Sequence, residues 1–422
     1  MQNLLILILL FVAVAIGWLL GRLSKPAKGD DAAEVSPVLS RDYLASLNYL
    51  LNEHSDRSLD SFVETLEVSS DTIDTHITLG NLFRMRGESD RAARLHQNLL
   101  ARPALNDRQN DQVQLELARD FMHLGVLDRA ENLLRPLVKG SQHSDIVSAA
   151  RTLLISLYEQ EKEWQQALDL VPSSLLARQP DLRCAAAHWQ CELAEQDFRR
   201  HDDRIALRRL KKALSIDPHC VRAYWLQAEQ LHRQQRYRHE IKVLERLADQ
   251  SSDFAPIIIE PSITAFRCLK DENGLIAFLN QQIQATHGME AIIKRAELGI
   301  AREGIVQVAT QLDELQQKQP HLRGIAFLAL LLSRQAMMEL PASSNERAAN
   351  MLRQIHDHLQ RLDAHTPRYR CEKCGTTYSH LYWHCPKCKH WATIKPRDNV
   401  DSHIAQRETP AQRALNASST SR

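Results

Sequence analysis

Apolar residues recur at three- and four-residue steps along most of this chain, from Arg41 to about residue 366. That spacing places them on one face of an α-helix, and each periodic segment runs for roughly a dozen residues. Almost nothing before residue 368 alternates apolar and polar positions in the two-residue period of a strand. The pattern therefore predicts an all-α fold over residues 40–366.

The helical segments share a pattern of small and aromatic residues. Two stretches carry it at the same offsets, ITLGNLFRMRGESDRAARLHQNLL at 77–100 and LELARDFMHLGVLDRAENLLRPL at 115–137. The matching residues are Leu79, Gly80, Phe83, Gly87 and Ala92 in the first stretch, and Leu117, Ala118, Phe121, Gly125 and Ala130 in the second. This is the tetratricopeptide pattern, in which a small residue on the second helix of a pair lets the two helices cross closely.

The position at which the two helices of a pair cross recurs along the chain. It is found at Ser58, Ala92, Ala130, Ala167, Ala206 and Glu240, with spacings of 34, 38, 37, 39 and 34 residues. An irregular helical bundle would not return the same offsets. Beyond about residue 250 the markers slip, and we expect two or three degenerate helix pairs there. Stacked pairs form a superhelix whose concave face binds an extended peptide or a partner helix.

The first 21 residues contain no charged side chain. An apolar run from Leu4 to Gly21 would span about 27 Å as a helix, close to the thickness of the hydrocarbon core of a bilayer. A cleaved signal peptide is the rival interpretation, but no Lys or Arg precedes the run and no small-x-small cleavage site follows it. We predict a transmembrane anchor at 1–21 and a juxtamembrane linker at 22–39.

Positive charges follow the apolar run directly, at Arg22, Lys25 and Lys28. The positive-inside rule then places the rest of the chain on the cytoplasmic side of the membrane. That compartment is reducing, so a tight cluster of cysteines there favours metal binding over disulfides. The formal net charge of the whole chain is only +1, which excludes a global attraction to nucleic acid.

Four of the eight cysteines lie within CEKCGTTYSHLYWHCPKC, at Cys371, Cys374, Cys385 and Cys388. The spacing C-x2-C-x10-C-x2-C is typical of two turns that present four thiolates to one tetrahedral ion. Four thiolates leave no open position for an activated water, which argues against hydrolysis and for a structural or electron-transfer site. Four unligated buried cysteines are the alternative, and paired C-x-x-C spacing disfavours it.

Other residues of this segment qualify the prediction. Gly375 permits the turn after the second cysteine, and Pro386 stiffens the other turn. His384 and His390 are expected to flank the site and not to bind the ion. Zinc and iron both suit four sulfurs, and the spacing does not choose between them. The remaining cysteines are expected to be small core residues, at Cys184, Cys191, Cys220 and Cys268.

No phosphate-binding, dinucleotide-binding, nucleophile-elbow or zinc-protease motif occurs, so we predict that the protein is not an enzyme. Basic and aromatic residues surround the cysteines, which leaves an RNA-binding zinc ribbon as one alternative. A tethered redox carrier is the other. The aromatic side chains can also fill the small module or pack on the last helices, and we expect the module to fold onto the end of the superhelix.

Two segments give the chain a family resemblance. The first repeat begins YLASLNYLLNEHSDRSLDSFVETL, and the C-terminal module reads RYRCEKCGTTYSHLYWHCPKCKHWATIKP. With the N-terminal anchor, they resemble the lipopolysaccharide assembly protein B family over residues 1 to about 397. The resemblance implies a repeat domain at 40–366 and a rubredoxin-like metal-binding domain at 367–397. The repeats that are degenerate after about 250 and the polar tail at 398–422 match the family least well, and from its composition we expect the tail to be disordered.

The resemblance also implies a function. Members of the family are inner-membrane adaptors without catalysis, which regulate lipopolysaccharide synthesis. They promote degradation of the lipid A pathway deacetylase by the membrane-anchored AAA+ protease FtsH, and coordination of other lipopolysaccharide-assembly proteins is a further expectation. The rubredoxin-type cysteines carry over to Cys371, Cys374, Cys385 and Cys388, with one iron ion as the family's usual metal. No nucleic acid partner is expected, and the sequence leaves a homodimer open.

Overall fold

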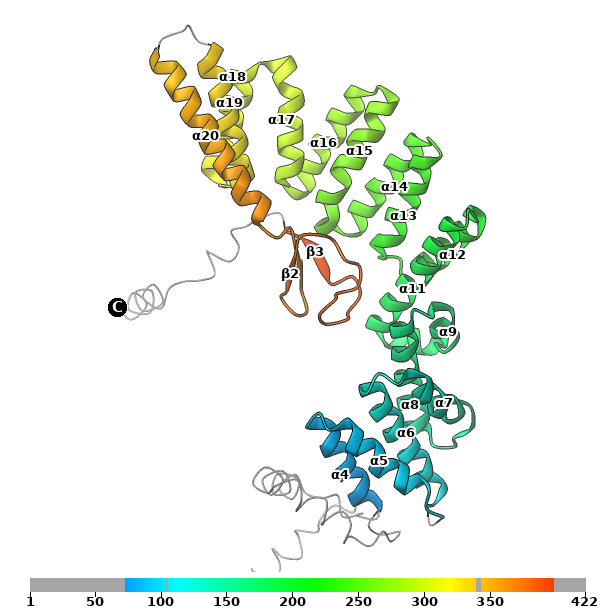
Figure 1. The fold of residues 1–422 in the computed structure, drawn as a ribbon. Coiled ribbons are helices and arrows are strands. Elements are labelled where there is room, and N and C mark those ends of the chain that lie inside the picture. The colour runs from blue at the N-terminus through cyan, green and yellow to red at the C-terminus, as the bar shows by residue number, and fades with distance from the viewer. Residues whose placement is uncertain (1–72, 104, 339–342, 398–422) are drawn as a thin grey trace, which may run out of the picture. The chain divides into compact units, whose positions relative to one another are not determined.

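A computed structural model describes residues 73–103, 105–338 and 343–397 of the chain (Figure 1). The predicted anchor at 1–21, the linker at 22–39, the first repeat with Ser58 and the tail at 398–422 lie outside the described residues. Within the described ranges, no helix combines the length and apolar character needed to cross a membrane. The chain divides into two compact units, Met1–Glu116 and Leu117–Arg422.

The described residues are mainly α-helical, as the periodicity predicts. In the first unit lie α4 (Ile73–Met85), α5 (Ser89–Leu100) and most of α6 (Asp107–His123), which runs on into the second unit. The helices of the second unit are α7 (Leu127–Gly140), α8 (Ser144–Glu161), α9 (Trp164–Asp169), α10 (Ser173–Arg178), α11 (Pro180–Arg199), α12 (Asp203–Ile216), α13 (Val221–Arg233), α14 (Tyr237–Gln250), the 3-10 turn η1 (Ser252–Phe254), α15 (Ala255–Leu269), α16 (Glu272–Thr286), α17 (Met289–Glu303), α18 (Ile305–Lys318), α19 (Leu322–Met338) and α20 (Ser343–His365).

The predicted crossing positions are confirmed wherever the structure describes them. Ala92, Ala130, Ala167 and Ala206 have no exposed surface, and Glu240 is only 2% exposed. A larger side chain at the alanine positions would push the two helices of a pair apart, because packed interiors have few voids that could take extra atoms. At Glu240 the carboxylate is instead accommodated by a hydrogen bond from Nδ1 of His232, 3.0 Å away.

Beyond residue 250 the structure has three further helix pairs, α15 with α16, α17 with α18, and α19 with α20. The crossing register does not stop there, although the sequence pattern suggested that it slips. Gly274 follows Glu240 by 34 residues, and a Cβ added to it would lie 2.9 Å from the Phe266 ring. Val308 follows by another 34 and is buried. At the crossing of α17 and α18 the small residue is on the first helix, at Gly299. A Cβ added to Gly299 would lie 3.2 Å from Val308.

A small three-stranded sheet follows α20. Its strands are β1 (Tyr369–Cys371), β2 (Thr377–Tyr378) and β3 (Ile394–Pro396), in the order β2-β1-β3, and both pairings are antiparallel. Cys371 is opposite Ile394 in the second pairing. In Figure 1 this sheet and its loops lie beside the second unit's helices, on the inner side of their curve.

Candidate metal centre

Two matching turns bring the cysteines to one point. In the first turn the N–H of Gly375 donates to the carbonyl of Cys371, and in the second the N–H of Lys389 donates to the carbonyl of Cys385. Gly375 has a φ of 72°, as the sequence led us to expect of a tight turn, and Lys389 has a φ of 58°. Glycine takes that conformation freely, whereas lysine does so at a cost, so the second turn is the more constrained of the two.

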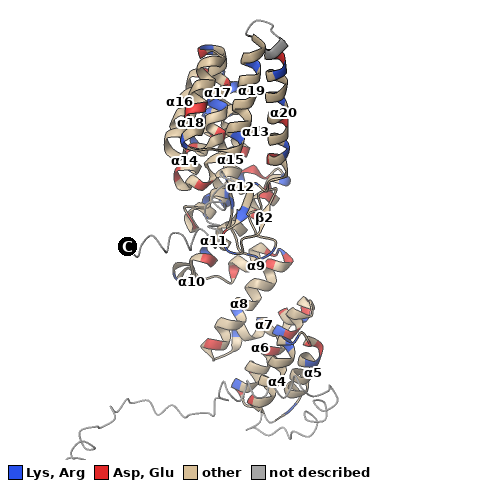
Figure 2. Cartoon of the chain, turned by 90° about the vertical axis from the view of Figure 1, so that its left-hand side faces the viewer, with Lys and Arg blue, Asp and Glu red and all other residues tan. Residues whose placement is uncertain are grey.

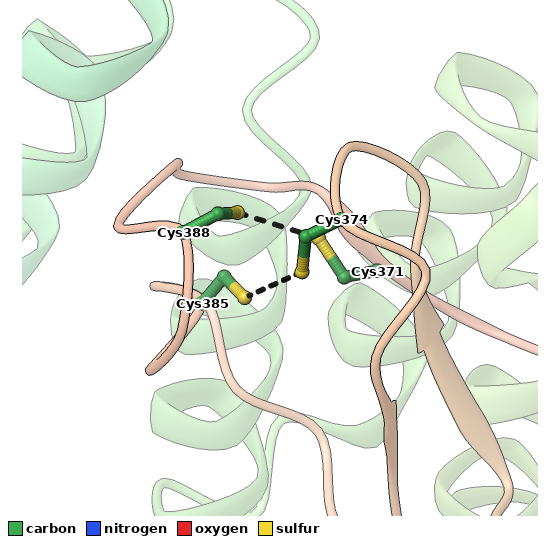
Figure 3. Close-up of side chains that lie close together, drawn as sticks. All are labelled: Cys371, Cys374, Cys385 and Cys388. Carbon is green, nitrogen blue, oxygen red and sulfur yellow. Dashed lines mark hydrogen bonds between the residues drawn. The ribbon is translucent and has the colours of Figure 1, made fainter. Parts of the chain in front are cut away.

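The four sulfur atoms converge (Figure 3). The Sγ atoms of Cys371, Cys374, Cys385 and Cys388 all lie within 4.8 Å of one another. Two of their separations are 3.6 Å, from Cys371 to Cys388, and 3.8 Å, from Cys374 to Cys385. A tetrahedron of thiolates bonded at about 2.3 Å has edges of about 3.8 Å, so the donor set fits a single ion of zinc or iron.

Hydroxyl groups surround the sulfurs, and nothing in the sequence pattern singled them out. The hydroxyls of Thr376 and Thr393 each lie 3.3 Å from a sulfur, of Cys374 and Cys371 respectively. The Tyr378 hydroxyl lies 3.2 Å from the sulfur of Cys385. Hydroxyls so placed can donate to thiolates, and outer hydrogen bonds of this kind hold ligands in position and tune the ion.

These contacts act on the ionisation of the thiols. Burial disfavours the thiolate of Cys385, but the N–H of Cys388 and the Tyr378 hydroxyl outweigh it and lower the pKa of Cys385 to about 6. The hydrogen bond to Cys385 in turn raises the pKa of Tyr378 to about 12, so this hydroxyl keeps its proton and acts as a donor. Metal ions bind the thiolate form, so the low pKa of Cys385 favours metal binding by this ligand at neutral pH. Burial raises the pKa of Cys388 to about 12, so this thiol would give up its proton to the incoming ion.

The two histidines beside the second turn are occupied elsewhere, in line with their expected flanking position. Nε2 of His384 donates to the carbonyl of Lys389 at 2.9 Å, and Nδ1 of His390 donates to the carbonyl of Cys388 at 2.8 Å. The ring of His384 also stacks on Trp391, with ring centroids 4.4 Å apart.

Trp391 attaches the metal module to α8, α9 and α11. Its indole N–H donates to Oε1 of Glu159 at 2.8 Å, and its ring meets Trp164 edge-on with centroids 5.9 Å apart. On α11, His188 stacks on Trp391 at 5.1 Å. Complete burial lowers the pKa of His188 well below its usual range, so a neutral imidazole lies against the module. Glu159 also accepts the indole N–H of Trp189, so two tryptophans share one carboxylate oxygen.

A second contact joins the module to the segment after α14. Trp383 stacks on Phe254 of η1 with centroids 5.9 Å apart, and with Leu381 it packs against the hydrophobic core of α13 to α17. Lys395 of β3 pairs with Asp253 and lies 3.1 Å from Glu372. Sequence reasoning counted these aromatic residues without finding their aromatic partners on the helices, which are more than 120 residues away along the chain.

Comparison with known proteins identifies the family to which the chain belongs. The family model described as "Rubredoxin metal binding domain" matches residues 369–396, the whole sheet and both cysteine turns. The lipopolysaccharide assembly protein B of Escherichia coli strain K12 is 32% identical over 397 residues, which cover 94% of this chain and 99% of that protein. The chain belongs to the lipopolysaccharide assembly protein B family.

Other relatives and solved structures extend the comparison. The lipopolysaccharide assembly protein B of Haemophilus influenzae is 31% identical over 406 residues, 94% of this chain and 99% of that protein. The crystal structure of MamA protein is 21% identical, with a TM-score of 0.31, and covers 44% of this chain and 96% of its own. The crystal structure of a tetratricopeptide repeat protein from Parabacteroides merdae is 14% identical, also with a TM-score of 0.31, and covers 68% of this chain and 100% of its own. TM-scores this low add nothing to the fold described above.

In this member of the lipopolysaccharide assembly protein B family, the expectation that the module folds onto the end of the repeats is wrong. The end helix α20 does touch it through Asp363, which pairs with Arg368 at 3.6 Å. The aromatic contacts, however, are with α9, α11 and η1, and the Trp391 hydrogen bond is to α8, all in the middle of the array. The array curves, so a module tied to its last helix can reach helices far earlier in the sequence.

The four other cysteines give a mixed result. Cys191 and Cys220 are buried, as expected of core residues, with their sulfurs 3.9 Å apart. Cys184 is half-buried, and burial raises its pKa to about 12. Cys268 is exposed, so the expectation of a core position is wrong for this residue. It lies in the last turn of α15, beside Tyr237 of α14, and a hydrogen bond with Cys268 raises the pKa of Tyr237.

Proposed function

We propose that the protein is an adaptor in lipopolysaccharide assembly that holds partner proteins on its helical repeats and has no catalytic chemistry of its own. The observation that carries the proposal is a closed four-sulfur site held against the inner side of the repeat array by Trp391 and Trp383. A closed site offers no position at which a substrate could bind the ion. The name shared by relatives that match nearly the full chain supports the biological context.

In this proposal the metal site has a structural role, because it keeps the repeat array in one shape. Cys371, Cys374, Cys385 and Cys388 would hold one ion, and we propose iron, with zinc as the other ion that four sulfurs accommodate. When bound, the ion supplies crosslinks that replace a hydrophobic core, since the module's own core is little more than Cys371, Cys385 and Ile394. The folded module then holds α8, α11 and η1 at fixed positions relative to one another.

The finer part of the proposal concerns the membrane. We propose that residues 1–21 anchor the chain in the inner membrane, with the repeats on the cytoplasmic side. Docked clients, among them the lipid A pathway deacetylase, would be brought near the membrane protease FtsH. Confinement of both proteins to one plane raises their effective concentration without any new contact. Regulation of lipopolysaccharide synthesis would follow from the rate at which the deacetylase is degraded.

Deleting residues 2–21 tests this function. The truncated chain should remain folded and metal-loaded, because every contact described above lies after residue 72, yet it should regulate deacetylase turnover poorly in cells. A matched control replaces residues 2–21 by an unrelated membrane-spanning helix, which should restore activity. Full regulation by the truncated chain would contradict the proximity mechanism. Crosslinking from membranes, with the anchor intact, should recover the protease and the deacetylase, and their absence would contradict the choice of partners.

A further inference from the structure

Two adjoining cavities open along α11, α13 and α15 beside the metal module. One, of about 420 Å³, extends from α13 to α14 and α15 and includes Glu260 and Thr264. The other, of about 380 Å³, lies between α11 and α13 and is bounded by Trp383 of the module. Trp225 and Arg233 line both, so the two form a single groove.

The acidic residues of this groove are already paired. Their partners are Arg222 for Glu195 at 2.6 Å, the Trp225 indole N–H for Glu229 at 3.0 Å, His232 for Glu240 at 3.0 Å and Lys294 for Glu260 at 2.8 Å. Two arginines of the groove, Arg199 and Arg233, are exposed and make no ion pair or hydrogen bond within the described part of the chain. The groove therefore has cationic groups left to offer a ligand, while its carboxylates are satisfied.

These arginines recur with the repeat. Arg199 and Arg233 are the last residues of α11 and α13, and they are 34 residues apart. Another 34 residues on, Arg267 lies in the last turn of α15, exposed and likewise without an ion pair among the described residues. Arg267 follows Thr264 by three residues and Glu260 by seven on one face of α15, and it lines a further cavity of about 350 Å³ beyond the groove. We call Arg199, Arg233 and Arg267 the arginine ladder.

Apolar side chains line the groove beside the arginines of the ladder. Trp225 is half-buried and lines both cavities. Phe198 and Trp383 line the cavity between α11 and α13, and Pro261 lines the cavity that extends to α15. An extended chain presents side chains alternately, so it can place acidic groups on the arginines and apolar groups on the rings in between.

We propose that the arginine ladder binds an extended peptide segment of a partner protein in which acidic side chains are interleaved with apolar ones. The proposal rests on the adaptor function and names the chemistry of its client. Nucleic acid fits less well, because its backbone carries a negative charge at every nucleotide and Glu195, Glu229 and Glu260 interrupt the row of arginines, whereas a peptide can place its acidic side chains at the arginines alone. Acidic and basic residues are also interspersed over the helices, with no continuous basic stripe among the residues described (Figure 2).

Selection from a peptide library tests the proposal. A phage-displayed library of random peptides of about 12 residues, which span about 40 Å when extended, is selected on the full-length, metal-loaded chain. The selected peptides should contain Asp or Glu next to apolar residues. Labelled synthetic copies should bind about ten-fold or more weakly to the R199E/R233E variant, and should lose affinity as salt rises. The R238E/R246E variant makes the same charge change at two exposed sites on α14, outside the groove, and should bind normally.

The outcomes separate this proposal from the adaptor function. Selected peptides that lack acidic residues, or that bind R199E/R233E as well as they bind the unmodified chain, overturn the ladder and leave the adaptor function standing. A library that yields no binder overturns the ladder as well, and crosslinking from membranes then decides the adaptor function separately. An oligouridine probe whose binding depends on Arg199 and Arg233 would assign the groove to nucleic acid instead. Circular dichroism and metal content, unchanged in R199E/R233E, establish that the variant is folded.

Discussion

The substitution Trp391→Ala should detach the metal module from the repeats while the ion stays bound. Trp391 is 8% exposed, and its ring lies between His188 of α11 and His384 of its own module. Its side chain belongs to the module, but the indole N–H and one ring face are directed at α8 and α11. None of its side-chain atoms contacts a sulfur in the contacts described. Loss of the ring should therefore weaken docking more than metal binding.

The size of the effect follows from these contacts. A buried tryptophan removes about 150–250 Å² from water, worth about 4–6 kcal/mol at ~25 cal/mol per Å². His384 covers one ring face within the module, so about half of this, 2–3 kcal/mol, belongs to docking. The hydrogen bond to Glu159 adds about 1 kcal/mol. A total of about 3–4 kcal/mol corresponds to an increase of the undocked population by a factor of several hundred.

Hydrogen exchange measured by mass spectrometry reports the docking of the module, and the metal content reports whether the ion stays bound. In Trp391→Ala, amides of α8 and α11 near Glu159 and His188 should exchange faster, while each chain retains its ion. The variant Trp391→Phe keeps most of the ring and loses only the indole N–H, so it should show a much smaller effect. Tyr382→Ala is the matched control, because Tyr382 is in the same module but is 43% exposed.

Two results would refute the reasoning. Unchanged exchange in Trp391→Ala, with the ion retained, would mean that Trp391 does not hold the module on the helices. Equal acceleration in Trp391→Ala and Tyr382→Ala would mean that any loss of an aromatic side chain loosens the module, and that the specific contact with Glu159 and His188 has no special weight.

Three further predictions concern the metal and the repeats. The double variant Cys371→Ser/Cys374→Ser should lose its ion and its regulation in cells together, and regulation that survives metal loss would contradict the structural role of the site. Ala130→Leu should cost about 1–3 kcal/mol in urea unfolding by overpacking a helix crossing, whereas Ala301→Leu, at an exposed helical site, should be nearly neutral. Burial raises the folded-state pKa of Glu240 above 4.5, so its stabilising contribution is full at low pH and is lost as pH rises through that raised pKa. Unfolding at a series of pH values should therefore show Glu240→Gln gaining stability relative to the unmodified chain as pH rises, and a constant difference would contradict a raised pKa.

The repeat pattern could be predicted over the first part of the array because it is local. Helix crossings need a small residue on the second helix, and Ala92, Ala130, Ala167 and Ala206 meet that need at nearly constant spacing. The same register continues through Gly274 and Val308, where sequence reasoning lost it. At Val308 the need is met by Gly299 on the other helix. Close approach of two helices constrains the pair of residues and not either one alone, so a search for small residues at one position misses such an exchange.

From the residues alone one can predict the helical period, the crossing residues up to Glu240 and the four cysteines, since each depends on neighbours within a few turns or on two short C-x-x-C turns. The position of the metal module is visible only in the folded chain. Trp391 meets Glu159 across 232 positions of sequence, and no periodicity in either segment encodes that meeting. It depends on the accumulated curvature of the helix pairs, to which each pair contributes a small rotation. The groove of the arginine ladder, bounded by Trp383, follows from the same curvature.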